Sequence, residues 1–403
     1  MTLSRPLRYL MFALIYFAQG AIVSYFSALN PLYLTGRFGL PMSQVGLIGT
    51  IAMIPFVLKI FLGMLSDKVN LAGWGYRKPY IVIGLVIQIV CLLIVPQINA
   101  ASAFGLFALV AFILMAGQAL YDTCTDGLAL DTTPVEEQGK LQGFMVGGRA
   151  LGVVIISSLI GMIAERLGWA AVFYTLAAFT VIALPLVFFV REAPRPAERT
   201  FEWGAFKAFL SPALISLGLI GALYSFIING ADQIVMTFFS TNFGASMSTI
   251  GLMVTVWGLG VVAGGITGGW LTDRIGRKNS LLVAIFLALI SIGALAIIPS
   301  LGWAWGLVAA FGLAYGYYET VYFALSMRAS DPRIAASMYA ILMAVANIGT
   351  GIGLGVTGVL VDNAGFRLTF VILAGLNLLA LPLMGKILAQ APKPARVDLN
   401  NEF

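Results

Sequence analysis

Hydrophobic residues dominate this chain in long runs, each of about 20 residues and each followed by a shorter polar stretch. An apolar run of that length is typical of a helix that crosses a bilayer. Helices are favoured there because they satisfy their own backbone hydrogen bonds where no water is present. The pattern predicts twelve membrane-spanning helices: 8–34, 43–66, 79–97, 102–130, 141–163, 169–190, 212–240, 248–271, 279–298, 303–326, 335–361 and 366–388.

The composition also indicates a polytopic membrane protein. Of the 403 residues, 60% are hydrophobic and only 10% are charged, whereas a soluble protein carries about a quarter charged residues. Histidine is absent, which removes the commonest metal ligand and general base. Cys91 and Cys124 lie in different spans and lack a metal-binding spacing. We therefore expect no metal and no cofactor, and the lack of hydrolase and Walker motifs argues against an enzyme.

Lys and Arg residues are distributed asymmetrically between the two ends of the predicted spans. If the N-terminus is cytoplasmic, eighteen of the 23 lie on the cytoplasmic side, and only Arg37, Arg166 and Arg367 lie in outer loops. This excess follows the positive-inside rule, so the net charge of +6 does not indicate a nucleic-acid partner. We expect an integral protein of the bacterial inner membrane with both termini in the cytoplasm.

One long polar connection, REAPRPAERTFEWGAFKAFL, separates the first six spans from the last six. It predicts four parts: an N-terminal half (1–190), a cytoplasmic linker (191–211), a C-terminal half (212–390) and a cytoplasmic tail (391–403). The segments AERLGWAAVF and VDNAGFRLTF match each other at an offset of 197 residues, which carries Asp122 onto Glu319. The two halves are therefore related by an internal duplication.

Each half carries a G-x-x-x-D motif, followed by a basic pair, after its second span. The residues are Gly63, Asp67, Arg77 and Lys78 in the first half, and Gly269, Asp273, Arg277 and Lys278 in the second. Two such motifs in a six-plus-six chain resemble the signature loops of the major facilitator superfamily (MFS), and the resemblance covers the whole chain. It implies an all-α membrane protein with the MFS fold, in which two six-helix halves contain inverted three-helix repeats. It also implies that the motif residues form a cytoplasmic gate, although the basic residues could instead only fix topology.

Acidic residues inside the spans mark a candidate site. Asp122 and Asp126 lie in the fourth span, Asp232 in the seventh and Glu319 in the tenth. A charge at the bilayer centre costs roughly 2.5–3.5 kcal/mol on insertion scales, so it usually faces a cavity or a partner. The family resemblance implies that spans 1, 4, 7 and 10 line the substrate cavity. We therefore predict a proton-coupling and substrate cavity from these acids and from polar and aromatic neighbours: Gln19, Gln118, Asn229, Tyr315 and Tyr322.

Two bases, Lys59 and Arg149, lie inside the second and fifth spans. They are candidates to pair with Asp122 or Asp126 and belong to the same predicted cavity. For Asp126, a structural ion pair explains the residue as well as a transport role does. The aromatic residues of span 10 are explained equally well by packing or by stacking on a solute.

These features predict a proton-coupled secondary transporter, a symporter that works by alternating access. A carboxylate in a partly dry cavity binds a proton more readily than in water, and a nearby base opposes this effect. If the cavity opens to each face in turn, such an acid loads a proton on one side and releases it on the other. Sodium coupling is less favoured, because no tight carboxylate cluster is seen.

Local sequence features suggest the kind of solute. The span-4 pattern QALYDTCTDGLALD resembles the MFS branch of AmpG-type permeases, acetyl-CoA and folate–biopterin transporters and siderophore importers. That branch implies a small organic, anionic or amphiphilic solute. A multidrug or metabolite exporter fits the same residues, and LALDTTPVEEQGKLQG also resembles PucC-like assembly factors that move no solute. Expected partners are thus the solute, protons and the lipid bilayer, and the family resemblance implies a monomer.

Overall fold

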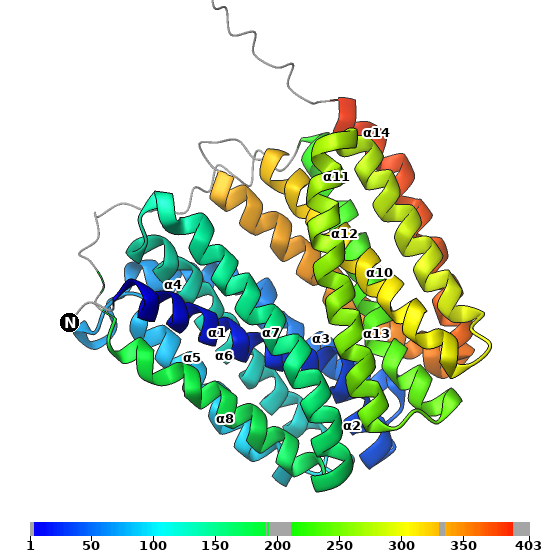
Figure 1. The fold of residues 1–403 in the computed structure, drawn as a ribbon, viewed down its shortest axis with the longest axis horizontal. Coiled ribbons are helices and arrows are strands. Elements are labelled where there is room, and N and C mark those ends of the chain that lie inside the picture. Colours follow the sequence, from blue (N-terminus) through cyan, green and yellow to red (C-terminus); the bar gives the residue numbers. More distant parts are fainter. Residues whose placement is uncertain (1–3, 191, 193–210, 330–334, 390–403) are drawn as a thin grey trace, which may run out of the picture.

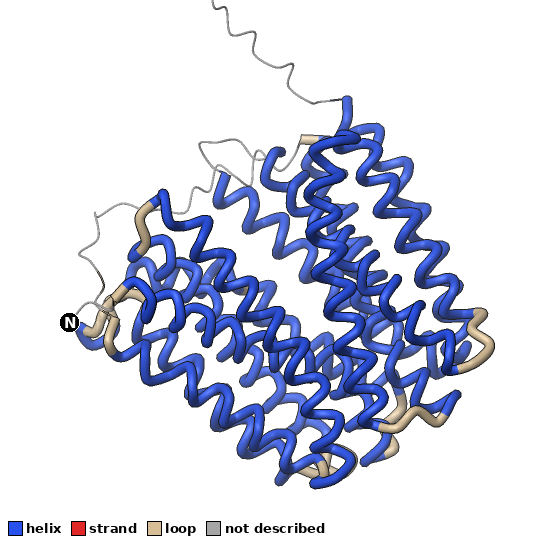
Figure 2. The backbone as a smooth tube through the Cα atoms, in the orientation of Figure 1, coloured by secondary structure: helices blue, strands red, loops and turns tan. Residues whose placement is uncertain are grey.

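The structure is a computed structural model that describes residues 4–190, 192, 211–329 and 335–389. Within these residues the chain is helical apart from short turns and loops, and no strand occurs (Figure 2). The elements in chain order are α1 (Arg5–Ser24), η1 (Tyr25–Leu29), α2 (Asn30–Phe38), α3 (Met42–Val57), α4 (Lys59–Lys68), η2 (Leu71–Gly73), α5 (Lys78–Ile94), η3 (Val95–Gln97), α6 (Phe104–Thr132), α7 (Val135–Leu167), α8 (Trp169–Phe188), α10 (Pro212–Phe243), α11 (Met247–Ala296), α12 (Leu301–Ala329), α13 (Ala335–Leu376), η4 (Asn377–Leu379) and α14 (Ala380–Ala389).

Each of the twelve predicted spans is helical in the structure, but spans and elements do not correspond one to one. Span 8–34 includes α1, η1 and part of α2, and span 43–66 includes α3 and part of α4. Among the described residues, nine helical segments are long and apolar enough to cross a membrane. Two of them, α11 and the segment Met338–Gly385, each contain two predicted spans. Predicted span 10 lies on α12, which is not among these nine segments. Its middle reads YGYYETVY, which makes α12 less apolar than they are.

The connections after predicted spans 8 and 11 differ from the loops that we expected. α11 and α13 continue through them, and only Gly276 and Gly365 leave the helical conformation, each with φ 77°. Their ψ values of 164° and 167° belong to a region that only glycine adopts without strain. Each glycine therefore lets one span turn directly into the next. The predicted loop between Asp273 and Arg277 is corrected accordingly: both residues lie on helix ends beside Gly276.

The helices form two groups, α1 to α8 and α10 to α14 (Figure 1). Glycines allow close crossings inside each group: Gly148 and Gly152 of α7 face the backbone of α1, and Gly349 of α13 faces the backbone of α10. A β-carbon at any of these positions would overlap the facing backbone, so glycine is required for the approach. Most of the predicted linker and all of the predicted tail lie outside the described residues, and the half boundaries stay a prediction.

Among the described residues, the two groups meet closely at one end of the molecule. There α3 packs against α13 and α7 packs against α11. The backbone of Gly46 meets that of Leu354, and the backbone of Gly161 meets that of Met247. We call this the closed end. Figure 1 shows the groups diverging toward the other end, which carries the N-terminus and α14 and which we call the terminal end.

Candidate functional site

A cavity of about 250 Å³ lies between the two helix groups. One side of its wall comes from α1, η1, α2, α3, α6 and α7, and the other side comes from α10, α12 and α13. Predicted spans 1, 4, 7 and 10 contribute to this wall, and so do spans 2, 5 and 11. Because both groups supply the wall, any movement of one group against the other changes the shape of the cavity.

Three charged side chains line the cavity: Arg149 from α7, Asp232 from α10 and Glu319 from α12. Glu319 exerts the largest attractive electrostatic interaction on Arg149. Within the described part of the chain, however, Arg149 makes no hydrogen bond and no ion pair within 4.0 Å. A guanidinium without a close carboxylate keeps its planar set of N–H donors available for an anionic group.

Asp232 of α10 and Ser27 of η1 line the cavity from opposite helix groups. Asp232 is buried. One turn earlier on the same helix, Asn229 accepts a hydrogen bond from the Tyr315 hydroxyl at 3.1 Å and donates one to Thr350 at 3.1 Å. These two contacts connect α10, α12 and α13 around the cavity wall.

Two glutamines line the cavity from the first helix group. Gln19 of α1 donates a hydrogen bond of 2.7 Å to Asp122. Gln118 of α6 is 1% exposed, and both polar atoms of its side chain lack a partner among the described residues. A buried amide normally has its hydrogen bonds satisfied, so Gln118 has a donor and an acceptor available for a bound molecule.

A second charged cluster lies within the first helix group, and we call Lys59, Asp122, Asp126 and Tyr16 the Lys59 cluster. Lys59 forms an ion pair with Asp122 and lies 3.8 Å from Asp126, and Tyr16 donates a hydrogen bond to Asp126. The pairing predicted for Lys59 is thus confirmed. Arg149, the other candidate base, pairs with neither acid and faces the cavity instead.

The Lys59 cluster lies beside the cavity rather than in its wall, because Lys59, Asp122 and Asp126 are not among the lining residues. Lys59 is the first residue of α4, after a break in the helix at Leu58. Both Lys59 and Asp126 interact electrostatically with Tyr339 of α13. The cluster therefore faces the opposite helix group without joining the cavity.

Tyr322 is a predicted cavity residue that the structure places elsewhere. Its side chain is fully buried and its hydroxyl donates to the backbone oxygen of Leu342 at 3.2 Å, while its ring lies against Gly221. Phe323, the next residue, lines the cavity. Successive residues of a helix point about 100° apart, so the two neighbours face different sides.

Several polar residues of the wall escaped the sequence prediction, among them Asn347 and Thr350 of α13. The side-chain amide of Asn347 donates to the backbone oxygen of Phe56 in the other helix group at 3.2 Å. Both residues interrupt the apolar run ILMAVANIGTGIG, which is the sequence signal for a polar face on this helix. The family resemblance implies a cavity lined by spans 1, 4, 7 and 10, and α13 carries span 11.

The predicted gate motif of the first half makes contacts inside its own helix group. Arg77 is buried, donates to Ser66 and lies 3.5 Å from Asp131. The ammonium of Lys78 donates to the backbone oxygen of Phe188 at 2.6 Å. In the same motif, Gly63 faces Thr123 of α6, and the side chain of Asp67 lies outside the described set.

The second motif lies on α11, where Gly269 faces Thr320 of α12 and Asp273 and Lys278 are exposed. Arg277, directly after Gly276, is half-buried. The gate role of both motifs stays a prediction.

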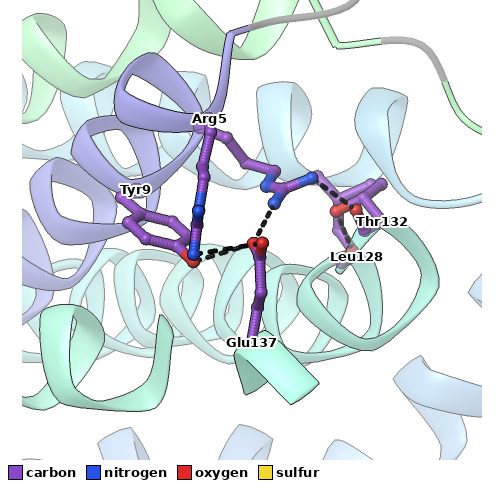
Figure 3. Close-up of polar contacts among 6 residues, drawn as sticks. Arg5, Tyr9, Leu128, Thr132 and Glu137 are labelled. Carbon is purple, nitrogen blue, oxygen red and sulfur yellow. Dashed lines mark hydrogen bonds and ion pairs between the residues drawn. The ribbon is translucent and has the colours of Figure 1, made fainter. Parts of the chain in front are cut away.

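A further polar cluster at the terminal end joins three helices of the first group (Figure 3). Glu137 of α7 accepts hydrogen bonds from Arg8 at 2.8 Å and from Tyr9 at 2.9 Å, and it lies 3.1 Å from Arg5. Arg8 also donates to the backbone oxygen of Thr132 at the end of α6. This cluster holds the start of α1 against α6 and α7, away from the cavity.

Membrane spans in two helix groups with a charged cavity between them are the arrangement found in secondary transporters. Residues 12–240 and 220–402 each match the Major Facilitator Superfamily. The chain belongs to this family, and it is an integral membrane protein with the MFS fold. Its curated relatives with named solutes are transporters.

Curated relatives include transporters of different solutes. The chain is 25% identical to the sialic acid transporter NanX of Escherichia coli over 61% of its own length, which spans 60% of that protein. It is 27% identical to the folate–biopterin transporter of Synechocystis, over 50% of this chain and 42% of that protein. An uncharacterised MFS-type transporter of Enterobacter is 24% identical over 98% of both chains.

Solved structures show the same fold. The nucleoside transporter NupG superposes with a TM-score of 0.77 at 16% identity, over 94% of this chain and 98% of NupG. A bacterial homologue of the lysosomal transporter Spinster, in an inward-facing and unoccupied conformation, superposes with a TM-score of 0.74 at 18% identity, over 97% of this chain and 100% of the homologue.

Proposed function

We propose that the protein is a proton-coupled symporter that carries a small organic anion across the bacterial inner membrane by alternating access. The observation that carries the proposal is the cavity charge pattern: Arg149 on one helix group faces Glu319 and Asp232 on the other. Arg149 supplies the anchor for the anionic group of the solute. The terminal end is the cytoplasmic end in this proposal, in agreement with the excess of Lys and Arg there.

Competition for Arg149 couples the two substrates. While the cavity is empty, Glu319 is the strongest counter-charge for the guanidinium. When the anion of the solute binds to Arg149, Glu319 loses this attraction and binds a proton more readily. The proton offsets the negative charge that the anion adds, so the loaded cavity carries the same net charge as the empty one. The rocking of the two helix groups then moves one negative charge fewer than it would without the proton.

The two curated relatives with named solutes agree with an anionic class. One is named for sialic acid, a carboxylate, and the other is named for folate and biopterin. We propose the class only, since the chain spans 60% and 42% of those two proteins. We further propose that the protein acts as a monomer of two six-helix halves, 1–190 and 212–390, joined by the linker 191–211.

Uptake into proteoliposomes tests the proposal. Sialic acid and folate are offered to the purified protein with and without an inward proton gradient. We expect the gradient to raise the uptake of one of these anions about tenfold or more, and a protonophore to abolish the increase. Glu319→Gln is expected to lose the response to the gradient and to retain solute exchange. The matched control is Glu137→Gln, an acid of the terminal-end cluster, which should respond like the parent.

Two results would overturn the proposal. Gradient-driven uptake that is unchanged in both Asp122→Asn and Glu319→Gln would exclude proton coupling through these acids. Binding of aromatic cations but of no anion, measured by thermal stabilisation of the detergent-purified protein, would favour the exporter alternative, because Asp232 and Tyr315 would then form the recognition site.

A further inference from the structure

Two acidic residues at the closed end make matching contacts across the two helix groups. Asp362 of α13 accepts hydrogen bonds from the backbone N–H groups of Met42 at 2.9 Å and Ser43 at 2.7 Å, at the start of α3. Glu165 of α7 accepts one from the backbone N–H of Ser248 at 2.8 Å, at the start of α11. In both cases a carboxylate of one group binds the first turn of a helix of the other group.

The internal duplication relates these contacts to each other. The offset of 197 residues that aligns AERLGWAAVF with VDNAGFRLTF carries Glu165 onto Asp362. Each acid lies three residues before a glycine with positive φ, Gly168 in one half and Gly365 in the other. Their targets correspond as well, since α3 and α11 both begin with Met-Ser. Glu165 and Asp362 thus occupy equivalent positions in the two repeats, and each contacts the other helix group. This symmetry indicates that the two contacts act as a pair.

Physical chemistry explains why these contacts hold the groups together. The first N–H groups of a helix lack partners inside the helix, and they carry partial positive charge. The N-cap residue of α3 is Pro41, which provides no side-chain hydrogen bond. Asp362 therefore supplies, from the other group, the acceptor that α3 lacks. Opening the closed end would remove both carboxylates from their helix starts.

We propose that Asp362 and Glu165 form two reciprocal latches that keep the cavity shut at the closed end and that release together when it opens there. The inference rests on the alternating-access part of the proposed function. It requires neither proton coupling nor an anionic solute. The glycine contacts at the same end, such as that of Gly46 with Leu354, allow the close approach on which the hydrogen bonds depend.

Spin-label distance measurements test the latches without any solute or pH gradient. Cys91 and Cys124, both buried, are first replaced by alanine. One label pair, Ala101 and Ser300, reports on the closed end, because both residues are exposed in loops of opposite groups there. A second pair, Lys140 of α7 and Asn279 of α11, reports on the terminal end, because both residues are exposed on helices of opposite groups there.

Removal of both latches should shift the protein toward the conformation that is open at the closed end. In Asp362→Ala/Glu165→Ala we expect a longer distance between the closed-end labels and a shorter one between the terminal-end labels. Each single change should shift the equilibrium roughly two- to fivefold, and the pair roughly tenfold. Asn363→Ala is the matched control, because within the described part of the chain Asn363 bonds only to Val359 of its own helix, so its loss should leave both distances unchanged.

The conservative variants keep the test decisive if the alanine pair does not fold. Asp362→Asn/Glu165→Gln retains hydrogen-bond acceptors but removes both charges, so it should give a smaller shift in the same directions. Parental distance distributions in a folded alanine pair, or in the conservative pair where only that one folds, would overturn the latches. The proposed transport function would be unaffected by that result.

Discussion

The Lys59 cluster and the cavity both place charged residues within membrane-spanning helices, but the charges are neutralised by different partners. In the Lys59 cluster, a base and two acids of one helix group hold each other, and Tyr16 and Gln19 complete the hydrogen bonds. In the cavity, Arg149 faces acids of the other group without a close ion pair among the described residues. Charges that are satisfied within one group fix its structure, whereas charges left open between the groups are available to a solute.

The strongest way to test this comparison is to remove Lys59. Lys59→Met leaves Asp122, whose side chain is only 6% exposed, without its cation. Breaking a buried pair from one side costs about 3 kcal/mol of stability. We expect a clear loss of thermal stability in detergent, and recovery of most of that loss in Lys59→Met/Asp122→Asn. If the single variant is as stable as the parent, the cluster is not structural.

Arg149→Ala should show the opposite profile. Because Arg149 has no close partner in the described structure, its removal should leave thermal stability within about 0.5 kcal/mol of the parent. Uptake of the anion should fall about 100-fold, since the charged anchor is lost. Arg149→Lys keeps the charge but not the planar fork, so a loss of about tenfold is expected. Parallel measurements of uptake and unfolding separate the two effects, and a large stability loss in Arg149→Ala would contradict the comparison.

Gln118→Leu should have the smallest effect. It removes two buried polar atoms that lack partners in the described residues, so stability should stay the same or rise by about 1 kcal/mol. Solute affinity should fall about fivefold, because one hydrogen bond to the solute is lost. Isothermal titration with the transported anion measures this change. Unchanged affinity would show that Gln118 does not contact the solute.

The membrane-spanning helices could be predicted from the sequence, because long apolar runs must satisfy their backbone hydrogen bonds within the segment. Their arrangement in two six-helix halves was implied by the resemblance of the repeated motifs to the MFS. Asp122 also followed from its sequence, since an acid in such a run must find a base or a cavity, and Lys59 is that base. The choice between Lys59 and Arg149 could not be predicted. The choice depends on which face each helix turns toward its neighbours. A span that is hydrophobic on all sides does not indicate that face in its sequence.

Other features depend on contacts between distant segments. Tyr322 and Phe323 are adjacent and similar, so only the packing of α12 decides which of them reaches the cavity. Asp362 and Glu165 look like ordinary surface acids in the sequence. Their role becomes visible only where the starts of α3 and α11 meet them.

The glycines at the helix crossings have a consequence for how this sequence can diverge. At Gly148, Gly152 and Gly349 the facing backbone occupies the space of a β-carbon. Every single-nucleotide change of a glycine codon that alters the residue adds a side chain or stops translation, so such changes push two helices apart. Lipid-facing positions such as Ile266, which is 70% exposed, accept any apolar residue of suitable size. Descendants of this chain are therefore free to vary over the surface that faces lipid, while the crossings that shape each half stay fixed.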